Sequence, residues 1–284
     1  MTILITGSRG FLGRRAAAAF AELGYRVLTP SHGELDITDR SAVGHWFHQN
    51  LPQAVLHCAA VSDTGACQQD PKGTALVNIT GSEHLAQACM ECGAKLIFCS
   101  SDQVYAGAPF PGPHAEKEVL TPGNVYGRQK MLAEQKCLDQ LPETVCLRLS
   151  WMYDTVFLPA EHGHLLTSLK NTLSDESLSL TWPIHDRRGI TDVNAVVKNL
   201  EQAIFLPGGV YNFGSENDTD TYHTLQAVFT ELGLHCALER LMPNRQAFAH
   251  SPRDIRMDGS LAATHGILFP TTADGLISAL QKML

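Results

Sequence analysis

TILITGSRGFLG, residues 2–13, decides the fold. Its first five residues are a nearly all-apolar run, which is typical of a strand buried on both faces of a parallel sheet. Gly7, Gly10 and Gly13 follow at a spacing of three, and an alanine-rich helical pattern starts at Phe11. In this strand–turn–helix context the triplet predicts a dinucleotide site, with the helix N-terminus facing the phosphates. The alternative is a structural turn that binds no ligand.

Strand-like and helix-like segments alternate through the first half of the chain. Strand patterns cover residues 2–6, 25–29, 54–60, 95–100 and 144–150, and helical patterns cover 11–23, 40–50, 72–92 and 123–140. Strict alternation implies parallel pairing through right-handed crossovers. We therefore predict an α/β fold with a Rossmann-type, doubly wound parallel sheet.

The alternation breaks after Trp151. Irregular sequence covers 154–164, 173–189 and 243–258, helical patterns cover 164–172, 191–206, 221–233 and 272–283, and a short strand covers 209–214. We predict two domains. Residues 1–150 plus about 188–214 form the coenzyme domain, and about 151–187 plus 215–284 form a smaller, discontinuous substrate lobe.

Composition limits the classes of function. The 284 residues are 44% hydrophobic and 18% charged, as in an ordinary globular protein, and the net charge of -8 argues against nucleic-acid binding. No apolar run is long enough to span a membrane. Without a recognisable secretory signal, we expect a cytoplasmic protein whose eight cysteines are reduced thiols.

The residues around the second strand bear on the choice of coenzyme. An NAD site often has Asp or Glu there, but the chain runs into TPSH at 29–32, without a carboxylate. Arg9 in the glycine turn could bind a 2′-phosphate, with Ser31 and His32 as further donors, so we predict NADP(H), with NAD(H) as the alternative. Asp36 either accepts from the adenine amino group, with Ile37 covering the ring, or caps the next helix. Asp39 is expected to cap it.

Tyr126 and Lys130 are four residues apart on a predicted helix and so share one face. A nearby ammonium group lowers the pKa of a phenol, so this tyrosine could exchange a proton near neutral pH. The lysine could also bind nicotinamide-ribose hydroxyls. The alternative is an ordinary helix surface, but the position before the fifth strand favours the catalytic interpretation.

Serines end the fourth strand, in CSSDQVY at 99–105. Doubly wound sheets bind ligands at the carboxyl ends of their strands. We predict that Ser101, with Ser100 as second choice, binds a substrate carbonyl or alcohol; the alternative is that these serines only end the strand.

Three other patterns do not carry a metal or a nucleophile. Cys89 and Cys92 lack a second pair of ligands, and His162 and His164 lack a third. His57 and Cys58 are adjacent on a strand and point to opposite faces. We predict no metal.

Several ordered blocks together resemble the extended short-chain dehydrogenase/reductases, and within them most closely the dTDP-4-dehydrorhamnose reductase family. The blocks are TGSRGFLG at 6–13, LDITD at 35–39, SSDQVYAG at 100–107, NVYGRQK at 124–130, LRLSWMY at 147–153 and SPRDIRMDGSL at 251–261.

The resemblance implies roles for individual residues. Tyr126 would protonate the reduced carbonyl oxygen, Lys130 would bind ribose and tune Tyr126, and Ser101 would position the carbonyl. The expected coenzyme contacts are Gly7, Arg9, Gly10, Phe11, Leu12, Gly13, Ser31, Asp36, Ile37, Cys58, Ala59, Ala60, Tyr126 and Lys130. The expected substrate contacts are Ser101, Asp102, Gln103 and Trp151.

Two departures from the family pattern affect the substrate. Gln103 replaces an aromatic residue, and VSDTGACQQD at 61–70 matches the family segment poorly. We expect a reductase of a nucleotide-linked 4-keto sugar, an enzyme of the NAD(P)-dependent oxidoreductase class and a possible homodimer. The alternatives are an NADP-binding regulatory subunit, like the beta subunit of methionine adenosyltransferase, and a sugar-nucleotide epimerase.

Overall fold

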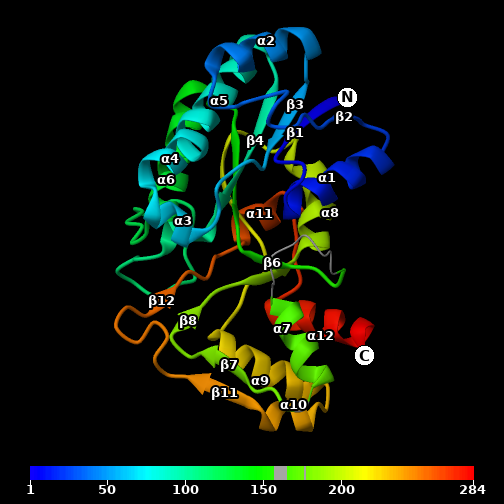
Figure 1. Ribbon diagram of the computed structural model, residues 1–284, viewed down its shortest axis with the longest axis vertical. Coiled ribbons are helices and arrows are strands. Elements are labelled where there is room, and N and C mark those ends of the chain that lie inside the picture. The colour runs from blue at the N-terminus through cyan, green and yellow to red at the C-terminus, as the bar shows by residue number, and fades with distance from the viewer. Residues whose placement is uncertain (157–164, 176) are drawn as a thin grey trace.

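The computed structural model describes residues 1–156, 165–175 and 177–284. Its centre is a six-stranded parallel sheet in the order β10-β5-β4-β3-β1-β2 (Figure 1). The strands are β1 (Thr2–Thr6), β2 (Arg26–Leu28), β3 (Ala54–His57), β4 (Lys95–Ser101), β5 (Val145–Leu149) and β10 (Gly209–Phe213). The predicted doubly wound α/β fold is confirmed.

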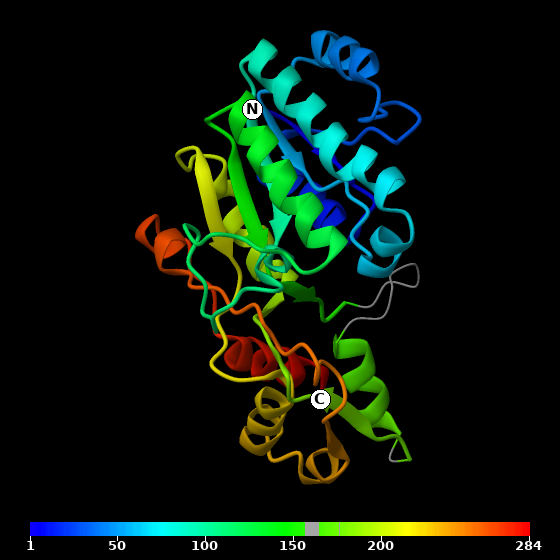
Figure 2. The same ribbon diagram turned by 90° about the vertical axis from the view of Figure 1, so that its left-hand side faces the viewer.

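Helices cover both faces of this sheet, as the apolar strands require. In β1, Ile3 and Ile5 pack against one face and Leu4 against the other. The first face carries α1 (Phe11–Glu22), α8 (Val193–Ala203) and α11 (Ser260–Thr264). The second carries α2 (Arg40–Asn50), α5 (Ser82–Cys92) and α6 (Val125–Gln140), and Figure 2 shows α5 and α6 side by side on it.

Short helical segments follow the ends of β3 and β4. After β3 come α3 (Thr64–Gln69), α4 (Pro71–Ala75) and a π-helical turn (Leu76–Gly81) that continues into α5. A 3₁₀ turn (Asp102–Tyr105) follows β4 directly. These segments bring polar residues to the carboxyl edge of the sheet.

Those parts of the chain after Leu149 that do not join the sheet or its helices form a smaller lobe below that edge (Figure 1). It has its own apolar core, which includes Tyr153, Leu169, Leu225 and Leu276. Its helices are α7 (Leu165–Ser174), α9 (Thr221–Glu231), α10 (His235–Glu239) and α12 (Thr272–Met283). Its strands pair in twos: β6 (Trp151–Tyr153) with β9 (Ile190–Asp192), β7 (Leu180–Pro183) with β11 (Leu241–Asn244), and β8 (Asp186–Arg187) with β12 (Arg253–Asp254).

The structure corrects the sequence prediction mainly in this lobe. Residues 173–189, expected to be irregular, contain β7 and β8, and β11 and β12 lie in the segment 243–258 or at its edge. The helix expected from 191 begins at Val193, because Ile190–Asp192 pairs with β6. The strand expected over 54–60 ends at His57. Strands of two to four residues are too short to show a period of two, which accounts for these errors.

Candidate active site

A cleft of about 720 Å³ lies between the carboxyl edge of the sheet and the smaller lobe. A second cavity of about 270 Å³ meets it at Gly7 and Arg9, which line both. Every residue that the sequence singled out for coenzyme or substrate lines one of the two. The cleft takes Gly7, Arg9, Gly10, Phe11, Leu12, Gly13, Cys58, Ala60, Ser101, Asp102, Gln103, Tyr126, Lys130 and Trp151, and the second cavity adds Ser31, Asp36, Ile37 and Ala59.

The glycine turn leaves no room for side chains where β1 passes into α1. Gly7 has a φ of +66°, and a Cβ there would meet the backbone nitrogen of Ala59 at 2.6 Å. A Cβ on Gly13 would overlap the Gly7 carbonyl oxygen, so α1 could not pack so closely. Among the described residues no side chain caps the N-terminus of α1, which opens at Gly10 onto the cleft. The turn is therefore shaped to place backbone N–H groups against an anion.

The two aspartates in the segment after β2 have different roles. Asp39 caps α2, as predicted, by accepting from the backbone nitrogens of Ser41 and Ala42. Asp36 does not cap that helix; its Oδ1 accepts from the backbone nitrogen and hydroxyl of Thr38, at 2.9 and 2.8 Å.

Residues 29–32 after the second strand have no carboxylate, as the sequence shows, but Glu34 two residues further on brings one to the same place. Glu34 Oε2 turns back to accept from the backbone nitrogen and the hydroxyl of Ser31, at 2.8 and 2.7 Å. Glu34 lies outside the segment that directly follows the strand, so the sequence pattern did not identify this side chain.

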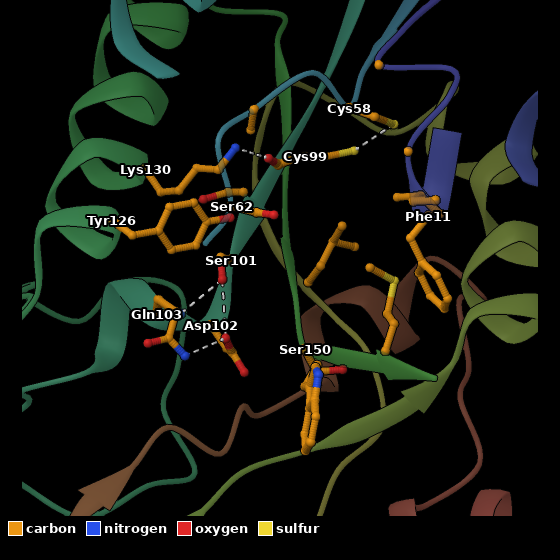
Figure 3. A pocket seen from close by; sticks show the side chains of 18 of the residues that line it. Phe11, Cys58, Ser62, Cys99, Ser101, Asp102, Gln103, Tyr126, Lys130 and Ser150 are labelled. Carbon is orange, nitrogen blue, oxygen red and sulfur yellow. Dashed lines mark hydrogen bonds between the residues drawn. The ribbon is translucent and has the colours of Figure 1, made fainter. Parts of the chain in front are cut away.

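Tyr126 lines the cleft, and its ring lies beside Ser101 (Figure 3). Burial raises the pKa of its phenol, and the nearby Asp102 carboxylate raises it further, whereas hydrogen bonding to Ser101 opposes the shift. The expected lowering of this pKa by Lys130 is not found, because burial dominates. Tyr126 is therefore a neutral phenol at pH 7, which is the form that donates a proton.

Lys130 projects from the same face of α6 but is held a short distance from the phenol. Its Nζ donates to the Cys99 carbonyl oxygen at 2.8 Å and lies 4.7 Å from the centre of the Phe98 ring and 5.8 Å from that of the Tyr126 ring (Figure 3). Burial lowers the pKa of this amine. On the cleft wall beside it, the thiol sulfurs of Cys58 and Cys99 are 3.6 Å apart.

Asp102 connects the sheet to the smaller lobe. Its Oδ2 accepts from Arg188 Nη2 at 2.6 Å, and its Oδ1 accepts from the Ser101 hydroxyl at 3.2 Å and the Gln103 amide at 3.3 Å. The Arg188 guanidinium lies 5.3 Å from the centre of the Trp151 ring, and its Nε is buried without a partner among the described residues. The ion pair thus fixes the Ser101 hydroxyl and puts a cation on the lobe side of the cleft.

Sequence reasoning missed two arginines of the cleft wall. Arg188 forms the ion pair just described, and Arg253 makes a bidentate pair with Asp186, at 2.7 and 2.8 Å. The run HDRRG at 185–189 and the block at 251–261 were the available signals. In both segments, the neighbouring residues do not indicate whether an arginine is buried or lies on the surface.

Buried polar side chains hold α6 in place behind the site. The amide of Asn78, in the π-helical turn, bonds both backbone groups of Val61 and donates to Gln129 at 2.7 Å. Glu134 on α6 pairs with Arg148 on β5, with both side chains about 5% exposed. Neither was predicted. Arg148 is the one polar residue of β5 and gives a signal, whereas Glu134 stands among many polar residues of α6 and gives none.

The residues discounted as metal ligands form no metal site where the structure describes them. His57 is buried, with its ring nitrogens bonded to the hydroxyls of Thr6 and Ser82 at 2.7 and 3.0 Å. Cys89 and Cys92 are free thiols. His162 and His164 lie outside the described residues. Within those residues no cluster of three or more metal-ligating side chains occurs.

No described helix has the length and apolarity needed to cross a bilayer.

Comparisons with known proteins agree with the fold and with the resemblance. The beta subunit of methionine adenosyltransferase 2 from Pongo abelii is 26% identical over 93% of this chain and 82% of its own length. A dTDP-4-dehydrorhamnose reductase from Mycobacterium tuberculosis is 29% identical over 88% of this chain and 82% of its own. The structure of a Bacillus anthracis dTDP-4-dehydrorhamnose reductase in complex with NADP has a TM-score of 0.84 at 20% identity, covering 99% of this chain and 98% of that one. The family model for the RmlD substrate binding domain matches residues 1–283, and the chain belongs to that family.

Proposed function

We propose that this protein is an NAD(P)H-dependent reductase of a nucleotide-linked 4-keto sugar, with Tyr126 as the proton donor. The observation that carries the proposal is a neutral phenol beside Ser101, in a cleft continuous with the glycine turn. Relatives named dTDP-4-dehydrorhamnose reductase and dTDP-4-keto-6-deoxy-D-glucose reductase support this substrate class.

The two cavities fit a dinucleotide. The uncapped N-terminus of α1 would hold the pyrophosphate, and the second cavity would take the adenosine, with Ile37 and Ala59 in its wall. Lys130 would bind the nicotinamide ribose, because its Nζ has one carbonyl partner and keeps further donor capacity. The reduced nicotinamide supplies the hydride.

The protein's part in the reaction is to position the ketone and to donate one proton. In the free protein the Ser101 hydroxyl donates to Asp102. With substrate bound it would turn this one donor to the carbonyl oxygen and fix the oxygen's place beside Tyr126. As hydride reaches the carbonyl carbon, negative charge grows on the oxygen. Tyr126 then gives its proton to that oxygen, which completes the alcohol and leaves a phenolate. The charge of the Lys130 ammonium, 5.8 Å from the centre of the Tyr126 ring, would stabilise this phenolate.

The smaller lobe supplies the sugar-nucleotide side of the cleft. Trp151, Arg188 and Arg253 line the cleft. An indole face suits a pyranose ring, and guanidinium groups suit the diphosphate. We therefore assign residues 1–150 plus about 188–214 to the coenzyme and the remainder to the substrate, except that α11 packs against the coenzyme-binding sheet. Arg188 lies at the junction.

The test is direct. The purified protein is mixed with NADPH or NADH and a panel of dTDP-linked and other nucleotide-linked 4-keto sugars, and oxidation is followed at the absorbance of the reduced nicotinamide. The matching 4-hydroxy sugars serve as controls. Loss of absorbance with a keto sugar only is the expected result. Tight coenzyme binding without oxidation by any sugar would rule the proposal out.

A regulatory subunit is the second candidate, favoured by the similarity to the beta subunit of methionine adenosyltransferase 2. In that case the nucleotide would act as a structural ligand. Pull-down of an adenosyltransferase, with coenzyme bound but never oxidised, would support it over the reductase.

A further inference from the structure

The loop between β2 and α2 places an ionised carboxylate beside the cavity proposed for adenosine. Glu34 is exposed, and its Oε2 accepts from both the hydroxyl and the backbone nitrogen of Ser31. These two hydrogen bonds, and to a smaller extent the charge of Arg9, hold the pKa of Glu34 below its ordinary value. The carboxylate is therefore charged at neutral pH and lies within electrostatic range of Arg9.

The charges around this cavity do not favour the binding of a further anion, such as a 2′-phosphate. Arg9 is a permanent cation there, and its side chain has no hydrogen-bond partner among the residues that the structure describes. His32 faces the Asp36 carboxylate, with Nδ1 and Oδ1 4.0 Å apart. Arg9 thus acts on the Glu34 carboxylate beside the cavity, and His32 lies near the Asp36 carboxylate in its wall.

We propose that Glu34 is the coenzyme-specificity residue of this site and that it disfavours the 2′-phosphate of NADP(H). It occupies both donors of Ser31, which a phosphate would need, and places a negative charge beside that phosphate. The unphosphorylated ribose of NAD(H) brings hydroxyls instead, which can donate to a carboxylate. Arg9 acts in the opposite direction by attracting the phosphate. The inference rests on the proposed function, since it requires that a dinucleotide binds here.

The experiment measures the dissociation constants of NADPH and NADH without substrate, by nucleotide fluorescence, for the wild type and for Glu34→Gln. The glutamine keeps an oxygen that can accept from Ser31 but removes the charge. We expect NADPH to bind about tenfold more tightly and NADH to change by less than about twofold, because only the phosphate interacts strongly with the lost charge. Glu22→Gln, an exposed residue at the end of α1, removes the same charge elsewhere and should change neither constant.

Arg9→Gln provides the opposing test and should weaken NADPH about tenfold while leaving NADH nearly unchanged. Both effects should shrink at high salt, because the groups are exposed. An unchanged ratio of the two constants in Glu34→Gln, or an equal change in both, would overturn the inference while leaving the reductase proposal intact. If the wild type binds neither nucleotide, the proposed function fails as well.

Discussion

Replacing Arg148 by methionine should destabilise the protein strongly, because Arg148 neutralises a buried carboxylate. Its Nε and Nη2 donate to Glu134 at 3.0 and 2.7 Å, and its Nη1 donates to the Tyr105 hydroxyl at 2.7 Å. The two charged side chains are 4% and 5% exposed. Without the arginine, Glu134 keeps only the Ser100 hydroxyl as a donor among the described residues.

The expected loss follows from the cost of leaving that carboxylate unpaired. Removing one partner of a buried ion pair costs about 3–5 kcal/mol, whereas replacing both partners by apolar residues is often close to neutral. We therefore expect Arg148→Met to lose about 3–5 kcal/mol of unfolding free energy, and the double change Arg148→Met with Glu134→Leu to recover most of it.

Urea titration followed by tryptophan fluorescence measures these free energies, and the chain has three tryptophans to report unfolding. A matched control lies on the same helix: Lys136 pairs with Glu83 at 2.8 Å, with exposures of 44% and 29%. Lys136→Met should cost less than about 1 kcal/mol. If Arg148→Met also costs less than about 1 kcal/mol, or if the double variant is less stable than the single one, the reasoning is refuted.

Three further predictions concern the site and its surroundings. Burial lowers the pKa of His57 to about 3. Below pH 6.5 the unfolded chain therefore takes up a proton that the folded chain does not. As the pH is lowered from 6.5 toward 3, the free energy of unfolding should decrease by up to about 1.4 kcal/mol per pH unit. His57→Gln should make that acid dependence shallower in urea titrations at pH 4 to 7, and an unchanged slope would contradict the assignment. Ser101→Ala should lower kcat about a hundredfold with coenzyme affinity unchanged, and a loss of affinity instead would place the hydroxyl on the coenzyme. Since the pKa of Tyr126 is raised, its ionisation should cause no decline in the rate of reduction between pH 6 and 9. A neutral donor would be contradicted by a kcat that falls with a midpoint near pH 7, if that midpoint also moves in Asp102→Asn.

The parts that could be predicted are those with a local signal. The glycine turn was recognisable because three glycines stand between a strand pattern and a helix pattern. Tyr126 and Lys130 were recognisable because a spacing of four puts both on one face of α6. Ser101 followed from its place at the end of a strand. Each of these needs only the period of one element and the edge of the sheet that it reaches.

The parts that were missed depend on contacts between distant segments. Asp102 and Arg188 are 86 positions apart, and only the packing of the smaller lobe brings them together. The pKa of Tyr126 was predicted in the wrong direction, because spacing shows a neighbouring lysine but not the burial that outweighs it. Glu34 was overlooked because its carboxylate returns to Ser31 through a turn.

The central claim is that Tyr126 donates the proton, and a single-turnover experiment on Tyr126→Phe tests it most directly. Protein saturated with reduced coenzyme is mixed with the active keto sugar, and hydride transfer is followed by stopped-flow absorbance. The account predicts a rate at least about a hundredfold below wild type, with the dissociation constant of the coenzyme unchanged within about twofold. A phenylalanine variant that transfers hydride within tenfold of the wild-type rate would contradict it.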